Sequence, residues 1–217
     1  MNKLDLRDKK LSELLLKWYD KNKRSFPWRS NDLTPFQLFI AELLLQKTNA
    51  YQVEKIFPDF IKKYPDVKSL QKVSIDVLSE YLRPLGLFNR RARDLKRIAN
   101  ILKKENNTLP RDKKKLIKLP GIGNYIANAL ICFAFNEPIP IVDTNIGRIM
   151  KRLYSFPVKD APSRDTSLFD KMCNLIPETD FKKFNYALLD LGALICKSRD
   201  PLCEKCPLTK ICNYYLK

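Results

Sequence analysis

The chain has 217 residues, 45% of them hydrophobic, which is enough for one large globular domain or two small ones. Its 41 lysines and arginines outnumber 24 acidic residues, and with no histidine the net charge is +17. No apolar run is long enough to span a bilayer, and any proton transfer must use Asp, Glu, Lys, Tyr, Cys or water. The positive charge suits a nucleic-acid backbone or an anionic membrane surface, although a solvated lysine-rich surface has the same composition.

The N-terminal sequence MNKLDLRDKK does not have the features of a secretory signal. We therefore expect a cytoplasmic protein in a reducing compartment, where disulfides explain the six cysteines poorly.

Apolar residues recur at helical spacing along the chain, which predicts an all-α fold with about ten helices. The pattern is clearest at residues 11–19, 36–44, 73–82, 95–102, 126–135 and 184–195. Only five glycines occur, and most of the fourteen prolines lie between these segments, as helix breakers do. Residues 138–142 are too few and too proline-broken to predict a strand.

The helix predicted near residues 36–44 carries a single charged residue, Glu42, between Asp32 and Lys47. Apolar residues surround most of this helix, and burial would favour the protonated form of Glu42. A protonated carboxyl could act as a general acid near neutral pH. A carboxylate neutralised by a partner such as Arg29, or a gap in the apolar coverage, explains the pattern equally well.

Residues 90–118 hold twelve basic and three acidic residues, a net charge of +9. This basic segment leads into a turn, KLPGIG, whose two glycines let a phosphate approach the amides that open the next helix. The pattern predicts a hairpin between two helices that binds the DNA backbone, while a plain helix–helix turn is the alternative. The expected contacts are at Leu119, Gly121, Ile122, Gly123 and Asn124.

Asp143 follows the apolar residues 139–142 and precedes a helix expected at residues 144–153. As an N-cap it would accept hydrogen bonds from first-turn amides, which would keep it ionised. An ionised carboxylate could also stabilise a developing sugar cation, as in glycosidic cleavage. From the residues alone, capping is the better interpretation. Tyr125, two residues beyond the hairpin, has the ordinary interpretation of a core tyrosine.

Four cysteines lie within 17 residues as C-x6-C-x2-C-x5-C. Four thiolates on short loops in a reducing compartment predict a structural metal or iron–sulfur site, and spacing alone does not separate zinc from a cluster. The predicted ligands are Cys196, Cys203, Cys206 and Cys212. Cys132 and Cys173 lie in apolar helical contexts and are expected to be ordinary core residues.

The segments LPGIGNYIANAL and IVDTNIGRI, followed by the cysteine tail, resemble the iron–sulfur branch of the helix-hairpin-helix DNA glycosylases. The likeness runs from RSFPWRS and AELLLQKT through PLGLFNRRARDLK to the last cysteine. It implies two helical domains with a cleft between them: a six-helix barrel at residues 28–137, and a discontinuous domain at residues 1–27 and 138–217. The discontinuous domain would hold a [4Fe–4S] cluster in a loop at residues 196–212. The resemblance also implies action on a base flipped out of double-stranded DNA. A monomer is the simplest expectation, and we expect it to be associated with the nucleoid.

Within this superfamily the chain resembles the thymine/uracil-DNA mismatch glycosylases and the adenine DNA glycosylases most. Endonuclease III has a nucleophilic lysine where this chain has Tyr125, and tyrosine cannot form the imine needed for strand cleavage. Glu42 matches the catalytic glutamate of the mismatch and adenine enzymes, and Gln46 and Lys47 match the segment that fills the gap in the duplex. Asp143 would stabilise the sugar or position water, with support from Asn145.

These matches favour a monofunctional glycosylase that removes thymine or uracil opposite guanine. An adenine DNA glycosylase is the first alternative, although the further C-terminal domain usual there is absent from this sequence. An endonuclease III-like glycosylase/lyase and a non-catalytic DNA-binding module with a structural zinc also remain. A ferredoxin-like redox protein would have no use for the basic helical body.

Overall fold

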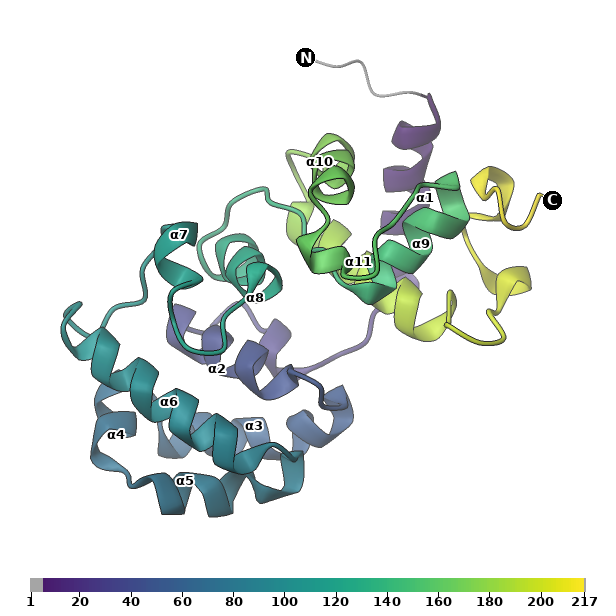
Figure 1. Cartoon of the computed structure of the whole chain (residues 1–217). Helices are drawn as coiled ribbons and strands as arrows, with labels where there is room; N and C mark the ends of the chain where they lie inside the picture. Colours follow the sequence, from purple (N-terminus) through teal and green to yellow (C-terminus); the bar gives the residue numbers. More distant parts are fainter. Residues whose placement is uncertain (1–5, 217) are drawn as a thin grey trace. The chain divides into compact units, whose positions relative to one another are not determined.

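The computed structural model describes residues 6–216, and all regular secondary structure there is helical (Figure 1). Eleven α-helices lie in this range, which confirms the all-α prediction. Within the same residues, no helix combines the length and apolarity needed to cross a membrane. The chain divides into two compact units. The continuous unit is Ser25–Phe135, and the discontinuous unit joins Met1–Arg24 to Asn136–Lys217.

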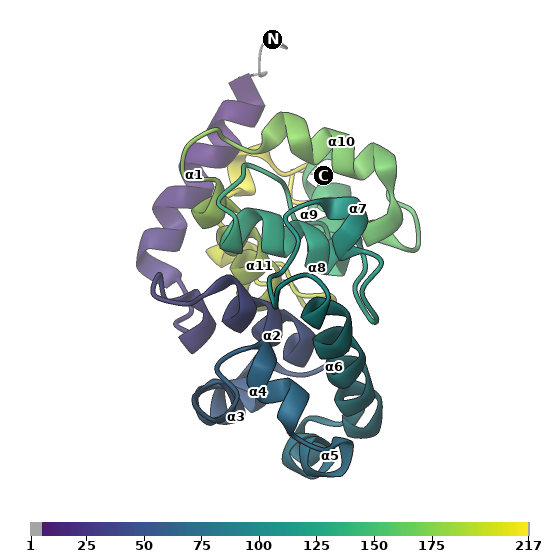
Figure 2. The same ribbon diagram turned by 90° about the vertical axis from the view of Figure 1, so that its left-hand side faces the viewer.

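The continuous unit is built around two groups of packed helices. Helix α6 packs against α4 and α5, and α2 packs against α3 and α8, as Figure 2 allows the reader to follow. The aromatic side chains of Phe39, Phe57 and Phe60 are fully buried in its core. Its helices are α2 (Pro35–Leu45), α3 (Ala50–Lys63), α4 (Val67–Lys72), α5 (Ile75–Leu82), α6 (Phe88–Lys103), α7 (Lys113–Leu116) and α8 (Asn124–Ala129).

Helix α2, which carries Glu42, begins at a reciprocal capping box. The Thr34 hydroxyl accepts a hydrogen bond from the Gln37 amide at 3.3 Å, and the Gln37 side chain accepts one from the Thr34 amide at 2.9 Å. Pro35 occupies the first helical turn, where its missing N–H costs no hydrogen bond. The start of α2 is therefore set by local sequence.

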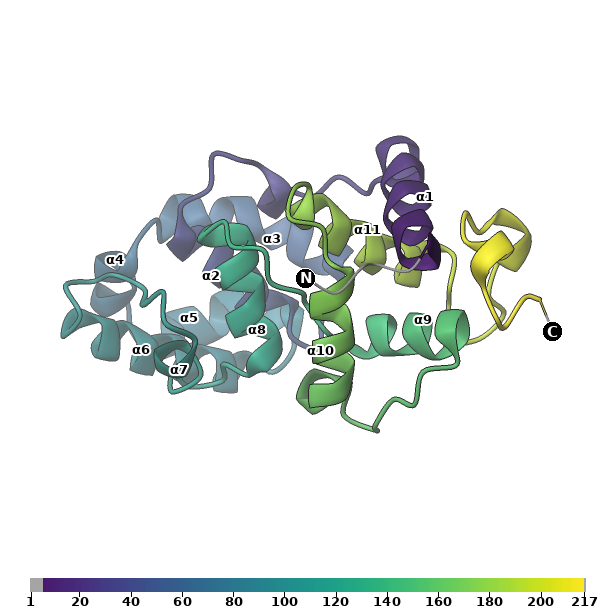
Figure 3. The same cartoon turned by 90° about the horizontal axis from the view of Figure 1, so that it is seen from above.

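The discontinuous unit brings the N-terminal helix together with the last third of the chain. Helix α11 (Phe181–Leu194) packs against both α1 (Leu6–Asn22) and α9 (Thr144–Tyr154), and α10 (Thr166–Leu175) completes the unit (Figure 3). Leu11, Leu15, Phe184 and Leu188 belong to one buried apolar cluster. An ion pair of 2.7 Å joins Arg24, just after α1, to the buried Asp190 on α11. After α11 the cysteine tail (yellow in Figure 3) contains only short 3-10 turns.

One predicted helix has a different geometry from the one expected. The segment at residues 126–135 is α-helical to Ala129 and then π-helical over Leu130–Ala134. The amide of Phe135 donates to the carbonyl of Leu130 at 3.0 Å, five residues back. Residues 138–142 form no regular element, as the sequence predicts.

Candidate active site

Glu42 lies on the buried face of α2, and only 9% of its surface is exposed. Its Oε2 has no hydrogen-bond partner among the described residues. Burial raises the pKa of Glu42 from 4.5 to about 7, and the positive charge of Arg29 opposes this shift. The burial follows the sequence prediction, and Arg29 provides part of the neutralisation offered there as an alternative.

Asp143 is the N-cap of α9, which confirms the capping prediction. Its Oδ1 accepts from the Ile146 amide and its Oδ2 from the Asn145 side chain, each at 2.8 Å. The sequence led us to expect that such bonds keep the carboxylate ionised. Burial instead has the larger effect: the pKa of Asp143 lies above its usual value, although these bonds and the Arg148 charge lower it. A raised pKa makes the carboxylate a stronger proton acceptor.

A chain of hydrogen bonds leads from Asp143 to the start of the cysteine tail. Asn145 donates to Asp143 and accepts from Arg148 at 2.8 Å. Arg148 also donates to the carbonyls of Cys196 at 2.8 Å and Gly192 at 2.9 Å. A Cβ on Gly192 would come within 2.7 Å of the Asn145 Cβ, so α9 and α11 approach this closely only because residue 192 is glycine.

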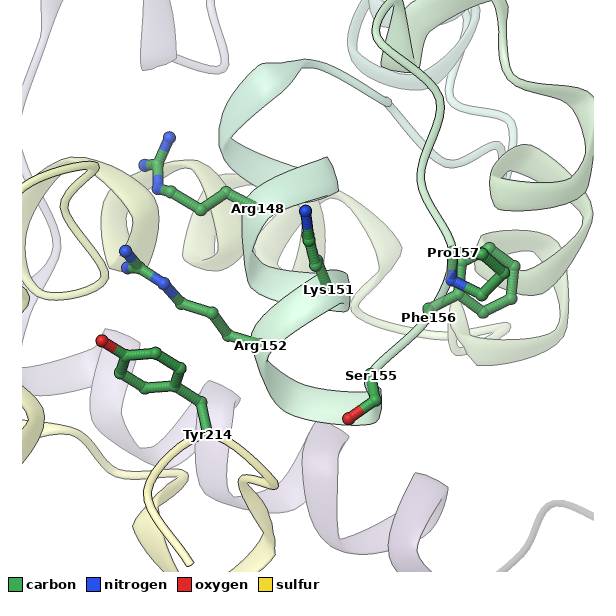
Figure 4. Close-up of a pocket in the computed structure, with 7 residues that line it drawn as sticks. All are labelled: Arg148, Lys151, Arg152, Ser155, Phe156, Pro157 and Tyr214. Carbon is green, nitrogen blue, oxygen red and sulfur yellow. The ribbon is translucent and has the colours of Figure 1, made fainter. Parts of the chain in front are cut away.

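Arg148 and Arg152 project from α9 toward the cysteine tail, as Figure 4 shows. Together with Lys151, Ser155 and Tyr214 they line a pocket of about 550 Å³ in the discontinuous unit. None of the side chains predicted for catalysis lines this pocket. The lining of this pocket therefore does not include the candidate active-site carboxylates.

Tyr125 is half-buried in the first turn of α8, and α8 packs against the Glu42 helix. The hairpin before it has the backbone that its glycines predict at one position: Gly121 has φ +76°, in the left-handed region. Leu119 and Ile122 are buried, so their expected DNA contacts would have to come from backbone groups. Gly121, Gly123 and Asn124 are exposed.

The end of α2 is joined to the hairpin. The side chain of Gln46 donates to the Gly121 carbonyl at 2.7 Å. Lys47 follows with an exposed side chain and a left-handed backbone, φ 52°. The structure thus brings two sequence-predicted DNA-contacting elements together within the continuous unit.

The basic segment is not uniformly a charged face, and this corrects the sequence interpretation. Most of its cations are exposed, but Arg91 is only 7% exposed and donates hydrogen bonds inside the continuous unit. Lys96 donates to three carbonyls that end or follow α4, those of Leu70, Gln71 and Val73. The phase of α6 gives the reason, since Arg91 lies one turn before the buried Leu95 and beside Ala92. Sequence reasoning missed Arg91, although its helical phase was a usable signal.

All four tail cysteines, Cys196, Cys203, Cys206 and Cys212, line one small cavity of the discontinuous unit. Burial first, and the neighbouring thiols next, hold the pKa of Cys203 above its usual value; burial also raises the pKa of Cys206 to about 11. The four thiols have the chemistry of a thiolate-bound metal centre. Across residues 6–216, however, no three His, Cys, Asp or Glu side chains are arranged to hold a metal ion.

Comparison with known proteins identifies the family. Residues 40–174, more than half of the chain, match the model of the HhH-GPD superfamily base excision DNA repair proteins. The chain belongs to the HhH-GPD superfamily. This membership confirms the resemblance stated from the sequence, and with it a DNA glycosylase that binds DNA in base excision repair.

Two curated relatives in the HhH-GPD superfamily cover most of this chain. The thymine-DNA glycosylase of Aeropyrum pernix is 36% identical, over 94% of each chain. The adenine DNA glycosylase of Mycobacterium tuberculosis is also 36% identical, over 89% of this chain and 64% of its own length.

Solved structures of the superfamily share the fold. A thermostable thymine-DNA glycosylase matches with a TM-score of 0.91, 31% identity and 97% of each chain covered. A non-covalent endonuclease III–DNA complex matches with a TM-score of 0.83, 25% identity and 98% of each chain covered. These likenesses confirm the helical fold class expected from the sequence.

Proposed function

We propose that this HhH-GPD protein is a monofunctional DNA glycosylase that removes thymine or uracil mispaired with guanine. The proposed product is an abasic site in an intact strand. The proposed setting is the DNA of the nucleoid, on which the protein would act as a monomer.

The observation that carries the proposal is the state of Glu42. Burial raises the pKa of this carboxyl to about 7, so a large fraction holds a proton at neutral pH. A neutral carboxylic acid can donate that proton to a departing base. A site that only bound DNA would have no need for a buried carboxyl group with one oxygen left without a hydrogen bond.

The proposed reaction is hydrolysis of the N-glycosidic bond. The bond between C1′ of the sugar and the base nitrogen breaks, and its electron pair leaves with the base, which receives a proton or hydrogen bond from Glu42. Asp143 stabilises the positive charge that develops on the sugar. Water then forms the new bond to C1′ and gives its proton to Asp143 or to solvent. Asn145, which donates to the Asp143 carboxylate, keeps that carboxylate oriented.

Tyr125 favours hydrolytic release of the base without cleavage of the DNA strand. Its phenol has no amine with which to form an imine to the sugar, so strand cleavage by that route is not available. The position of Tyr125 on α8, packed against α2, suits a role in shaping the base pocket. The near-complete alignment with a thymine-DNA glycosylase supports thymine as the target base.

We assign DNA contact to the hairpin and to the end of α2. Gly123 and Asn124 are exposed residues whose backbone can approach a phosphate of the DNA, with nearby cations on the basic segment adding attraction. Gln46 and Lys47 would enter the duplex where the flipped nucleotide leaves it. Leu119 and Ile122 anchor this hairpin in the core.

For the cysteine tail we propose a [4Fe–4S] cluster bound by Cys196, Cys203, Cys206 and Cys212, with zinc as the alternative. When bound, the cluster would supply four covalent links within a segment that has only short helical turns. Two groups of the chain itself already lie beside the cysteine sulfurs. Arg152 lies 3.4 Å from the Cys196 sulfur, and the Leu208 amide lies 3.5 Å from the Cys206 sulfur.

Removal of adenine is the second candidate function. It is favoured by the 36% identity to a mycobacterial adenine DNA glycosylase over 89% of this chain. Both functions use the same two carboxylates, so the choice between them depends on the base and its partner.

One panel of duplexes tests these functions. Oligonucleotides containing G·T, G·U, A·G, A·8-oxoguanine or thymine glycol are scored for abasic sites, with and without alkali. We expect release from G·T and G·U, with strand breaks only after alkali. Asp143→Asn keeps an oxygen that can accept the hydrogen bond from the Ile146 amide, so this variant should bind DNA normally. Its base release should be at least about 100-fold slower than that of the wild type. Wild-type turnover in that variant, or breaks without alkali, would contradict the proposal.

A further inference from the structure

The buried guanidinium of Arg91 connects helix α6 to the end of helix α2. Its Nη1 donates to the carbonyls of Leu43 at 2.8 Å and Leu44 at 2.7 Å. Its Nη2 donates to the Gln46 carbonyl at 2.6 Å and to the Thr48 hydroxyl, and its Nε donates to the Gly86 carbonyl at 3.1 Å. These five acceptors use all five N–H donors that a guanidinium has.

Three of these acceptors are carbonyls at the end of α2, where an α-helix leaves carbonyls without partners. The last turn of α2 presents such groups, and the positive charge of Arg91 is favoured at that negative end of the helix. No other side chain type could satisfy five acceptors with one planar group. The interaction therefore fixes the end of α2 together with the residues after it.

Those residues form a turn that is held from several directions. The Thr48 hydroxyl donates to the Leu85 carbonyl at 3.1 Å, and the Gln46 side chain donates to Gly121 in the hairpin. Between them Lys47 keeps a left-handed backbone that L-residues seldom adopt. Because this backbone conformation is unfavourable for an L-residue, contacts with the surrounding residues must stabilise it.

We propose that Arg91 is a positioning residue for base release, which holds the Gln46–Lys47–Thr48 turn in the one conformation that can enter the duplex. The inference rests on the proposed function of that turn. Arg91 touches neither substrate nor reacting atoms in this role. It acts by preorganising the turn, and it keeps the end of the Glu42 helix fixed to the same frame.

The test compares two buried or half-buried cations of the same helix. Arg91→Met removes the contacts to the turn, whereas Lys96→Met removes the similar capping of α4 and leaves the turn untouched. Thermal unfolding first measures what each change costs the fold. Hydrogen exchange of the amides at residues 45–48 then reports the turn directly. Single-turnover base release at saturating protein, with DNA affinity measured separately, reports the reaction.

We expect faster exchange at residues 45–48 and at least about tenfold slower base release in Arg91→Met, with DNA affinity changed much less. Lys96→Met should keep wild-type exchange at the turn and a release rate within about twofold of wild type, whatever its stability loss. If Arg91→Met fails to fold, Arg91→Lys takes its place. Its three donors should recover part of the rate.

Two results would overturn the inference. The first is that the Arg91 variant (Arg91→Met or Arg91→Lys) and Lys96→Met lose the same stability and slow base release equally. The second is that the Arg91 variant keeps wild-type hydrogen exchange at residues 45–48 and a wild-type rate of base release. Failure of the proposed function has a different signature, because wild-type protein would then release no base from any duplex in the panel.

Discussion

At the scale of single residues, Glu42 shows how burial can create an acid. Its helix is apolar on nearly all sides, so the charged form loses its hydration and receives only the partial compensation of Arg29. This part of the site could be predicted from sequence, because one carboxylate in a long apolar segment has few environments available. The size of the shift could not, since it depends on Arg29, a residue in a separate 3-10 turn.

The Glu42 proposal predicts a pH dependence. The protonated form is the donor, so base release should fall as pH rises through about 7 and reach a decline of about tenfold per pH unit above it. Single-turnover rates between pH 5.5 and 9 measure this. Glu42→Gln should be slow and should lack this decline. A wild-type rate that rises across the same range would count against Glu42 as the acid.

The free energy of unfolding tests the pKa of the Glu42 carboxyl independently. A pKa raised from 4.5 to about 7 means that the folded state binds the proton more tightly, so between these values stability falls as pH rises. Above pH 7 the full cost, about 3 kcal/mol at most, is present. Urea unfolding at pH 5 and pH 8 should show this fall in wild-type protein and a smaller one in Glu42→Gln.

Tyr125 carries the third prediction at this scale. Tyr125→Lys places an amine at the start of α8, where the sequence resemblance to endonuclease III leads us to expect that enzyme's nucleophilic lysine, and should create strand cleavage. The measurement is trapping of a protein–DNA adduct with borohydride on a duplex that the wild type processes. Tyr125→Arg is the matched control, since it adds charge without an amine able to form an imine. Absence of an adduct in an active lysine variant would remove Tyr125 from the base pocket.

At the scale of elements, the two hairpin glycines have different reasons to be glycine. Gly121 has a left-handed backbone, and a Cβ there would lie 3.3 Å from an Asp94 oxygen. At Gly123 a Cβ would meet nothing within 4 Å. The open space at the second position, the N-cap of α8, leaves room for close approach by a ligand.

These glycines make a pair of variants with separable outcomes. Gly121→Ala should lose about 1–2 kcal/mol of stability and bind DNA more weakly. Gly123→Ala should keep its stability to within about 0.5 kcal/mol and still bind DNA more weakly, because the methyl group occupies the path of a phosphate. Urea unfolding and anisotropy titrations with one duplex measure both. Unchanged affinity in a stable Gly123→Ala protein would exclude the hairpin as a phosphate site.

Elements also mark where sequence reasoning succeeds and where it stops. Periodicity and capping residues located α2 and α9 because these signals lie within each helix. The inward direction of Arg91 was available from its phase, but its five acceptors come from α2, its following turn and Gly86, which local patterns cannot align. The π-helical turn after α8 could not be predicted from apolar spacing, because that prediction assumes the 3.6 residues per turn of an α-helix.

At the scale of the whole molecule, the discontinuous unit could be anticipated only through family resemblance. Nothing local to Arg24 indicates an ion pair with Asp190, 166 residues later. Composition did indicate a partner: a net charge of +17 predicts strong attraction to DNA, yet Arg91 and Lys96 show that charge counts overstate the exposed surface. Charge thus identified the class of ligand better than the residues that meet it.

The cysteine tail makes the last prediction, because its order affects the rest of its unit. Arg7 on α1 donates to the Ile211 carbonyl and, at 2.9 Å, to the Asn213 side chain, and the Asn213 amide donates to Leu153 at the end of α9. A tail with four covalent links to one cluster would hold α1 and α9 through these bonds. Its loss should therefore loosen helices that contain no cysteine ligand.

Cys212→Ser should lose iron, absorbance near 400 nm and at least about 5 °C of thermal stability. Cys173→Ser is the matched control and should keep all three, because Cys173 lies outside the tail and is exposed, whereas the sequence wrongly predicted a core residue. Metal analysis of wild-type protein separates the alternatives, since zinc in place of iron would give a colourless protein with the same stability pattern. If wild-type protein contains neither iron nor zinc, or if metal-loaded wild-type protein melts at the same temperature as Cys212→Ser, the four thiols hold no structural centre, and the bonds from Arg7 and Asn213 order the tail by themselves.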